Sequence, residues 1–246
     1  MFKNLSERPF FYPSLVLGVC LVLAALIAGV FISTIKADSD TITSTGSAKV
    51  RVTSDSAKFT GSVVRTASEF DLKSGYANVA NDVKIIEAFL KEKGLSTEEY
   101  SIQPVSVNEV YQYGEGSQNL PKRYEFRQSI DINSKEIAKV ENVANSISSL
   151  VNKNVLFQSY GIQYLYSGLA EKRIELLGGA IQDAKARANE IAKSSGGSIG
   201  KLKSSTGGVV QVLSPNSIDV SDYGSYDTST KEKDISVTVR ATFKLN

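Results

Sequence analysis

The sequence contains no histidine and no tryptophan, and it has a single cysteine and a single methionine among 246 residues. Histidine is the commonest general base near neutral pH and the commonest metal ligand, so its absence removes the usual basis of many catalytic sites. The single cysteine, Cys20, lies in an apolar N-terminal segment, and the rest of the chain therefore has no thiol for a zinc site, a nucleophile or a disulfide. We expect no catalytic residues, no cofactor and no metal, and we predict that the protein is not an enzyme.

A strong charge of one sign is also lacking. The formal net charge is +2, and from Lys36 onward the sequence has 26 basic and 25 acidic residues. Proteins that bind nucleic acid carry a dense basic surface. The sequence therefore predicts no nucleic-acid partner.

Residues 10–35 form a run without any charged side chain. At about 1.5 Å per residue, a helix of this length crosses a hydrocarbon core of about 30 Å. Lys3 and Arg8 precede the run, which favours an N-terminus in the cytoplasm. The sequence predicts a cytoplasmic stub and transmembrane anchor at residues 1–36 and an extracytoplasmic domain at residues 37–246.

Two alternatives to an uncleaved anchor remain open. A cleaved signal peptide has a similar apolar region, although this run is long for one and no A-x-A site follows it. The segment LGVC, which ends at Cys20, faintly resembles a lipoprotein cleavage box. All three interpretations place the remainder of the chain outside the cytoplasm.

Three later segments, residues 72–90, 137–151 and 170–191, carry apolar side chains at alternating steps of three and four. This spacing gives a helix one apolar face, and runs this short are typical of helices that pack on a sheet. In the third segment the predicted face consists of Ala170, Ile174, Leu177, Ile181, Ala184, Ala188 and Ile191.

Between these helices the apolar side chains recur at every second position. Residues 235–245 and 124–132 alternate in this way, and Tyr160, Ile162, Tyr164 and Tyr166 form a third such face. Weaker strands are predicted at residues 41–52, 57–65, 101–111 and 201–213. Alternation on one face is typical of antiparallel sheets with one covered side.

The predicted fold class is α+β, with antiparallel sheets packed by long amphipathic helices and one N-terminal transmembrane helix. The predicted order is β-β-α-β-β-α-β-α-β-β. A helix followed by two strands occurs in residues 71–132 and again in residues 169–245, which hints at an internal duplication.

Glycines cluster in and after the third helical segment. Gly196, Gly197 and Gly200 follow the helix, whereas phosphate-binding loops place their glycines before one. These three residues therefore indicate the end of a helix. Gly178 and Gly179 lie within the same segment, where close packing against a neighbour or a local break in the helix would explain them.

Two loops, at residues 111–123 and 214–234, are rich in Gly, Ser, Asp and Tyr. Their tyrosines Tyr111, Tyr113, Tyr223 and Tyr226 are the candidate contacts to a ligand or partner. Exposed loop tyrosines with no partner are the alternative interpretation.

Several segments, taken in order, resemble the SIMPL-domain family of bacterial periplasmic and membrane-anchored proteins. ITSTGSAKVRVTSDSAKFTGSV is similar to the family's opening strands, and VKIIEAFLKEKGLSTEEYSIQPVSV to its helix, turn and strand. KRYEFRQSIDINS resembles the next strand, and the segment that ends AIQDAKARANEIAKSSGGSIGKL resembles the long Ala-rich helix and its exit. Ala48 and Ser54 depart from the family pattern, which usually has Gly and Pro there.

The resemblance covers residues 40–246 and implies an α+β domain without an established enzymatic activity. Some members form ring- or cylinder-like homo-oligomers, and some are associated with stress tolerance at the cell envelope. The leading hypothesis is a non-enzymatic protein of the bacterial inner membrane whose periplasmic domain self-associates or binds another envelope protein. The alternative is a small-ligand or glycan-binding module that uses the tyrosine-rich loops.

Overall fold

The computed structural model describes residues 11–37, 40–111, 120–219 and 221–246. It confirms the α+β class, and the order of helices and strands broadly follows the prediction. In chain order the elements are α1 (Phe11–Ala37), β1 (Thr41–Thr53), β2 (Ser56–Ser68), α2 (Leu72–Glu92), β3 (Tyr100–Ile102), β4 (Ser106–Val110), β5 (Arg123–Ser134), α3 (Ile137–Ser146), the 3-10 helix η3 (Ile147–Lys153), β6 (Phe157–Leu165), α4 (Leu169–Ser194), β7 (Ile199–Leu213), β8 (Ser225–Tyr226) and β9 (Glu232–Leu245).

The helix α1 contains the apolar run predicted to cross a membrane. Its window Pro13–Val30 is long and apolar enough to do so, and none of that window is buried. A signal anchor and a single membrane span are both compatible with this helix.

Beyond α1 the chain folds into two compact units, which are described separately. The first unit contains residues 1–48, 177–208 and 237–246, and its part beyond α1, which is residues 40–48, 177–208 and 237–246, is called unit 1; unit 2 comprises residues 49–176 and 209–236. The division falls within β1, α4, β7 and β9, so each of these elements contributes residues to both units.

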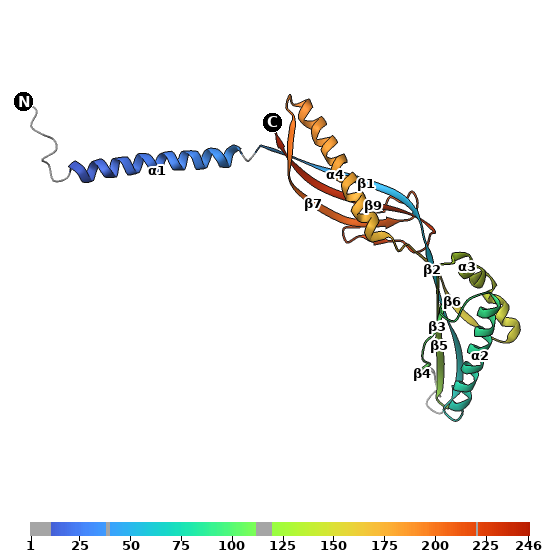
Figure 1. Cartoon of the computed structure of the whole chain (residues 1–246). Coiled ribbons are helices and arrows are strands. Elements are labelled where there is room, and N and C mark those ends of the chain that lie inside the picture. Colours follow the sequence, from blue (N-terminus) through green and yellow to red (C-terminus); the bar gives the residue numbers. More distant parts are fainter. Residues whose placement is uncertain (1–10, 38–39, 112–119, 220) are drawn as a thin grey trace, which may run out of the picture. The chain divides into compact units, whose positions relative to one another are not determined.

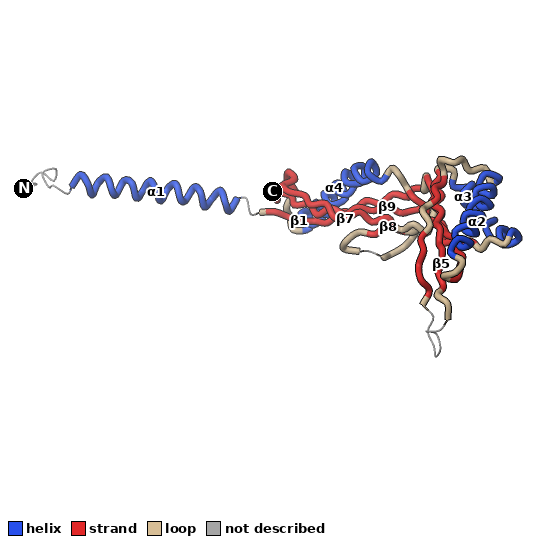
Figure 2. Tube along the Cα trace, turned by 90° about the horizontal axis from the view of Figure 1, so that it is seen from below, coloured by secondary structure: helices blue, strands red, loops and turns tan. Residues whose placement is uncertain are grey.

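Unit 2 is built on a sheet whose strands follow the order β3-β5-β2-β6, with β4 also paired to β5. All of these pairings are antiparallel. The helices α2 and α3 lie on one side of this sheet (Figures 1 and 2). Alternate side chains of β2 and β5, such as Phe59, Phe126 and Ile130, are buried together with Ile86 and Leu90 of α2. The core of unit 2 is therefore a layer of large aromatic and aliphatic side chains between sheet and helices.

Two expectations for unit 2 need correction. The strand predicted at residues 101–111 is divided into β3 and β4, because Pro104 between them has no N–H to donate to a ladder. Tyr160 does not share the face of Ile162 and Tyr164. The register of β6 against β2 shifts between Phe59 and Gly61, and Gly161 has φ of 86°. This bulge turns Tyr160 away from the core, where Ile162 and Tyr164 pack.

Unit 1 is built on residues from the sheet with the order β1-β9-β7-β8, and α4 covers one of its faces (Figure 1). Its core consists of Ala180, Ala184 and Ala188 of α4 against Val239, Ala241 and Phe243 of β9. The predicted apolar face of α4 is thus wrong in part, since Ile174 and Ile191 are 73% and 54% exposed. Alanines four residues apart form the buried face instead, because they allow the helix to approach the sheet closely.

The closeness of this approach is visible at Gly46 of β1. A Cβ atom at this position would lie 2.2 Å from both the Ala180 carbonyl oxygen and the Ala184 backbone nitrogen. Gly179 also faces the sheet, since its Cβ would lie 3.2 Å from the Cβ of Ala48, whereas Gly178 faces open space. The helix is continuous through both glycines, and close packing explains Gly179.

The end of α4 agrees with the predicted helix stop. Gly196 has φ of 80°, its N–H donates to the Lys193 carbonyl, and the Gly197 N–H donates to the Ala192 carbonyl. This pair of hydrogen bonds is the Schellman arrangement, which satisfies carbonyls at the end of a helix. The glycine cluster therefore has an architectural role.

The two sheets repeat one order of strands. In unit 2, β5 lies between β2 and the strands β3 and β4, and in the other sheet β9 lies between β1 and β7. In each case a helix is followed by the outer strand and then by the central strand. This is the arrangement that an internal duplication predicts.

Candidate functional site

The strand β1 forms one edge of its sheet, and its free side defines the candidate site. The Leu245 N–H donates to the Asp40 carbonyl at 2.9 Å, and the hydroxyls of Thr43 and Thr242 are 2.9 Å apart, so β1 and β9 run antiparallel. In such a pair the backbone groups alternate between facing the partner strand and facing away. The N–H and C=O groups of Thr43 and Thr45 therefore face the free edge.

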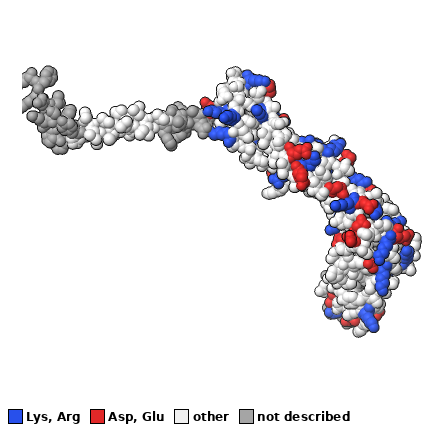
Figure 3. Space-filling view, viewed as in Figure 1, with Lys and Arg blue, Asp and Glu red and all other residues white. Residues whose placement is uncertain are grey.

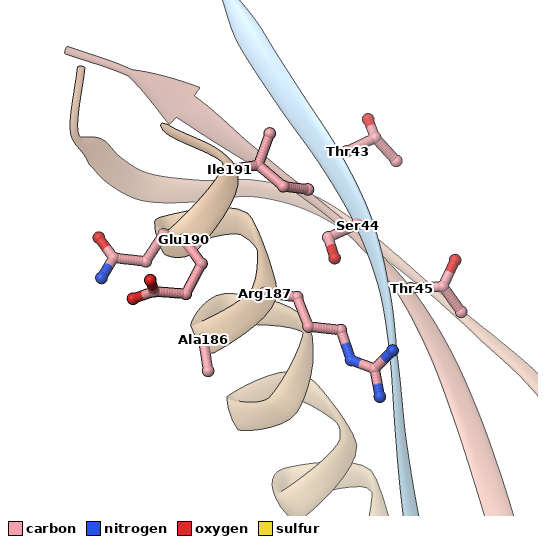
Figure 4. Close-up of a pocket in the computed structure, with 8 residues that line it drawn as sticks. Thr43, Ser44, Thr45, Ala186, Arg187, Glu190 and Ile191 are labelled. Carbon is pink, nitrogen blue, oxygen red and sulfur yellow. The ribbon is translucent and has the colours of Figure 1, made fainter. Parts of the chain in front are cut away.

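A groove of about 760 Å³ follows this edge (Figure 4). One wall is β1 and the other is the C-terminal half of α4. Its lining consists of Thr43, Ser44, Thr45, Ala186, Arg187, Asn189, Glu190 and Ile191. In the close-up, Ile191 and Arg187 extend from the helix toward the strand. The groove thus combines an open strand edge with apolar and charged side chains beside it.

One backbone N–H on the outward side of β1 already has a hydrogen-bond acceptor. The Ser47 N–H donates to Asp183 Oδ2 at 2.8 Å, and Asp183 also accepts a hydrogen bond from Arg187 Nε at 2.9 Å. The Ser47 N–H, followed by the Arg187 guanidinium, holds the pKa of Asp183 below its ordinary value. The carboxylate accepts the outward N–H of Ser47, whereas the outward side of the stretch from Thr41 to Thr45 has no paired strand among the described residues.

The opposite edge of the same sheet is open as well. The short strand β8 pairs only with Gln211 and Val212 of β7. From Lys201 to Val209, nine consecutive residues of β7 are exposed. A long strand exposed in this way is a template for pairing with another chain, unless it is shortened, bulged or covered.

The predicted tyrosine contacts are only partly free. Tyr111 and Tyr223 are 71% and 96% exposed, whereas Tyr113 lies outside the described residues. The Tyr226 hydroxyl accepts a hydrogen bond from the Tyr166 N–H at 2.9 Å, and its ring lies 5.7 Å from Lys233 Nζ. Tyr226 therefore has structural contacts within unit 2, and the role of the four tyrosines in binding stays a prediction.

The bulge in β6 creates a polar cluster that the sequence did not indicate. Arg127 Nη1 donates to Ser62 Oγ at 2.9 Å and to both Gln158 Oε1 and the Tyr160 hydroxyl at 3.1 Å. Arg127 also forms an ion pair with Glu125 at 3.0 Å. A glycine within a strand pattern, here Gly161, is the signal that indicates such a bulge.

Two buried carboxylates in unit 2 have structural partners. Asp82 accepts two hydrogen bonds from Arg65, at 2.6 and 2.8 Å. Asp234 contacts Arg51 and Lys49, each at 2.8 Å, and the Arg51 guanidinium is the main cause of a pKa well below the ordinary value. Among the described residues, no group of three His, Cys, Asp or Glu side chains is arranged to hold a metal ion.

Comparison with known families gives a match over most of the chain. The model of the SIMPL family, described as a protein of unknown function (DUF541), matches residues 42–243. The matched region includes every residue that lines the groove and the exposed stretch of β7. A search of the curated proteins finds no match to the chain.

Proposed function

The chain belongs to the SIMPL family, and from this premise we propose that it is a non-enzymatic, membrane-anchored envelope scaffold that assembles by strand addition. The groove beside β1 accepts an exposed strand from a second copy of the chain. That strand is the segment of β7 from Lys201 to Val209. Membership in a family of unknown function is consistent with a binding role of this kind.

The open edge of β1 beside its groove is the observation that carries the proposal. Backbone groups of Thr43 and Thr45 face the groove, and an incoming strand satisfies them with main-chain hydrogen bonds, as in other cases of strand addition. Arg187 and Ile191 on α4 contact the side chains of that strand. The exposed part of β7 has nine residues and the open stretch of β1 from Thr41 to Thr45 is shorter, so a strand from the second copy can pair along all of it.

The proposed contact joins two different surfaces. When one edge of a subunit pairs with the opposite edge of the next, the assembly closes into a ring or extends as a filament. A ring agrees with the resemblance to family members that form ring- or cylinder-like homo-oligomers.

The proposed location follows from α1. We place α1 across the bacterial inner membrane with the N-terminus in the cytoplasm, because Lys3 and Arg8 precede the apolar run. Both units then lie in the periplasm, where an assembled scaffold would support the envelope under stress.

A proline substitution in β1 tests the assembly. In Thr45→Pro the lost N–H faces the groove, so the pairing with β9 is kept while strand addition is blocked. We expect the full-length chain in detergent to change from an oligomer to a monomer by light scattering after size exclusion. Thr45→Val, which keeps the N–H, is the matched control and stays oligomeric. A wild-type chain that is monomeric at high concentration contradicts the proposal.

A second candidate function is binding of a small ligand or glycan. It is favoured by the exposure of Tyr223 and Tyr111 and by the exposed ring of Tyr160 above the Arg127 cluster. Thermal-shift measurements with envelope metabolites and cell-wall glycans test it. Stabilisation that is lost in Tyr111→Ala or Tyr223→Ala, but kept in Tyr12→Ala, would support this function.

A further inference from the structure

The balanced charge of the whole chain conceals a separation between the two units. Unit 1 carries seven basic side chains against three acidic ones, which are Asp40, Asp183 and Glu190. Unit 2 carries 18 basic and 21 acidic residues. On the face drawn in Figure 3, basic side chains outnumber acidic ones over unit 1, whereas both kinds are mixed over unit 2. The basic charge therefore belongs to the unit that directly follows α1.

One end of unit 1 is tied closely to α1 by the covalent chain. The helix ends at Ala37 and the strand β1 begins at Thr41. Three Cα–Cα steps of at most about 3.8 Å connect Ala37 to Asp40, so these two residues are no more than about 11 Å apart. The polar headgroup region on each side of a bilayer is about 5–8 Å thick. If α1 spans the membrane, this end of unit 1 is held at the lipid headgroups.

Hydrogen bonds identify which other residues share this end. The Leu245 N–H donates to the Asp40 carbonyl, and Ser198 and Asn246 exchange two backbone hydrogen bonds. Asp40, the end of β9 and the residues just before β7 therefore lie together. The Schellman turn at Gly196 places the last turn of α4 beside them.

Basic side chains predominate at this end. Lys193 lies in the last turn of α4, Lys201 follows the start of β7, and Lys244 lies next to Leu245, and all three are exposed. Lys203 lies two residues after Lys201 in β7, and Arg240 lies four residues before Lys244 in β9, so both are farther from this end. The acidic side chains here are Asp40 and Glu190, and Glu190 pairs with Lys193 at 3.1 Å. Basic side chains therefore outnumber acidic ones at this end of unit 1.

We infer that this end of unit 1, defined by Lys193, Lys201 and Lys244, binds anionic phospholipid headgroups around the anchor. Each lysine or arginine near an anionic membrane surface adds to binding, within a Debye length of about 8 Å. The tether keeps the unit at a high effective concentration above the lipids, so a modest attraction suffices. This contact orients unit 1 on the membrane, and it leaves the part of β7 beyond Lys203 for pairing with a neighbouring copy. The inference rests on the proposed anchoring by α1.

Fluorescence quenching measures the contact in the full-length chain. A Cys20→Ser, Ser198→Cys variant carries one fluorophore at the tethered end and is placed in nanodiscs with quencher-labelled lipids. One set contains phosphatidylcholine alone, and the other contains about one third phosphatidylglycerol. We expect stronger quenching with phosphatidylglycerol, and we expect 0.5 M salt to abolish the difference because it shortens the Debye length.

The triple variant K193E/K201E/K244E tests the assignment of residues. We expect it to lower the population in contact with phosphatidylglycerol by about tenfold or more. The triple variant K84E/K91E/K135E in unit 2 changes the charge equally and keeps the contact. Equal quenching in both lipid compositions, or an unchanged result in K193E/K201E/K244E, would overturn the inference.

The same measurement separates the failure of this inference from that of the anchor. Without a membrane-spanning α1, the probe shows no quenching in phosphatidylcholine, whereas an anchored chain without lipid binding shows equal quenching in both. A soluble poly(glycerol phosphate) that releases unit 1 from phosphatidylglycerol at equal phosphate concentration would indicate a cell-wall polymer as the partner and would also overturn the inference.

Discussion

The two units use different means to bury a helix against a sheet. Unit 2 packs Phe59, Phe89 and Phe126 with large aliphatic side chains, whereas unit 1 packs alanines of α4 against β9 around a single Phe243. Burial stabilises by about 25 cal/mol per Å² of apolar surface, so large side chains contribute more per residue. Unit 2 therefore has a core of large side chains, whereas unit 1 has a thin core, made mostly of small side chains that contribute less to stability.

The unit with the thin core also carries the open strand edges. Unit 1 contains the whole open stretch of β1 and nearly all of the exposed stretch of β7. A neighbouring copy that pairs with these edges adds the contacts that the thin core lacks, since any partner that binds only the folded state stabilises it. In the proposed assembly, association therefore completes unit 1.

The largest expected effect lies in the core of unit 2. Phe126→Ala removes a fully buried ring that contacts Tyr76 edge-on at 5.0 Å. We expect a loss of about 3–5 kcal/mol in the free energy of unfolding. Urea titration followed by tyrosine fluorescence measures it, because every tyrosine after Tyr12 lies in unit 2. Phe70→Ala, at an exposed ring, is the control and changes stability little.

The next effect concerns acid stability. In Asp234→Asn the charge-assisted hydrogen bonds to Arg51 weaken, and we expect a loss of about 1.5–3 kcal/mol at pH 7. The folded pKa of Asp234 lies below the unfolded value of about 3.9, so its stabilisation is complete above that pH and is lost as pH falls further. Urea titrations from pH 7 to 2.5 should show a shallower decline for the variant. If the free energies of unfolding of the variant and the wild type decline in parallel, Asp234 does not contribute to the loss of stability in acid.

In unit 1 the substitution that disturbs the packing of helix on sheet is Gly46→Ala. The added methyl group collides with the backbone of α4, and we expect a loss of about 1–3 kcal/mol. Circular dichroism at 222 nm should show an earlier transition of the helix, while tyrosine fluorescence should show unit 2 unchanged. Gly207→Ala is the control, because its Cβ would make an ordinary contact with Leu177 at 3.7 Å. A shift of the tyrosine transition in Gly46→Ala would contradict the independence of the two cores.

The smallest expected effect is a gain in stability. Gly178 lies within α4 and faces open space, so Gly178→Ala should raise the free energy of unfolding by up to about 1 kcal/mol. The same substitution at Gly179, which faces Ala48, should give less or a loss. Thermal unfolding of the two variants side by side compares them, and equal gains would show that α4 does not pack as closely as described.

Local patterns in the sequence predicted much of the fold. The spacing of apolar residues predicted α2 and β9 within a few residues, and the glycines after Ser194 predicted the end of α4. The buried face of α4 was missed in part because alanine ranks below isoleucine as a core residue, although small side chains suit a close helix. Gly161 is the local signal of the bulge that moves Tyr160, but the register against β2 that fixes the bulge depends on a distant segment.

The candidate site could not be predicted from the sequence. Whether a strand lies at an edge depends on pairings between segments far apart, such as β1 with β9, about 200 residues later. The charge separation was hidden for the same reason, because each unit is assembled from distant segments. The sequence therefore predicted the α+β class and the family, and its candidate contacts in the tyrosine-rich loops stay a prediction, whereas the groove lies beside Thr43 and Thr45.

The central claim is that β1 of one copy pairs with β7 of the next. In the full-length Cys20→Ser background, membranes that contain Thr43→Cys chains and Thr206→Cys chains are mixed in detergent and oxidised. We predict a disulfide-linked dimer that forms only between the two variants, with Ser204 and Ser205 as neighbouring positions to scan for register. Lys84→Cys on α2 replaces Thr206→Cys as the control and gives no dimer. Cross-linking within Thr43→Cys alone, or none with any β7 position, would contradict the account.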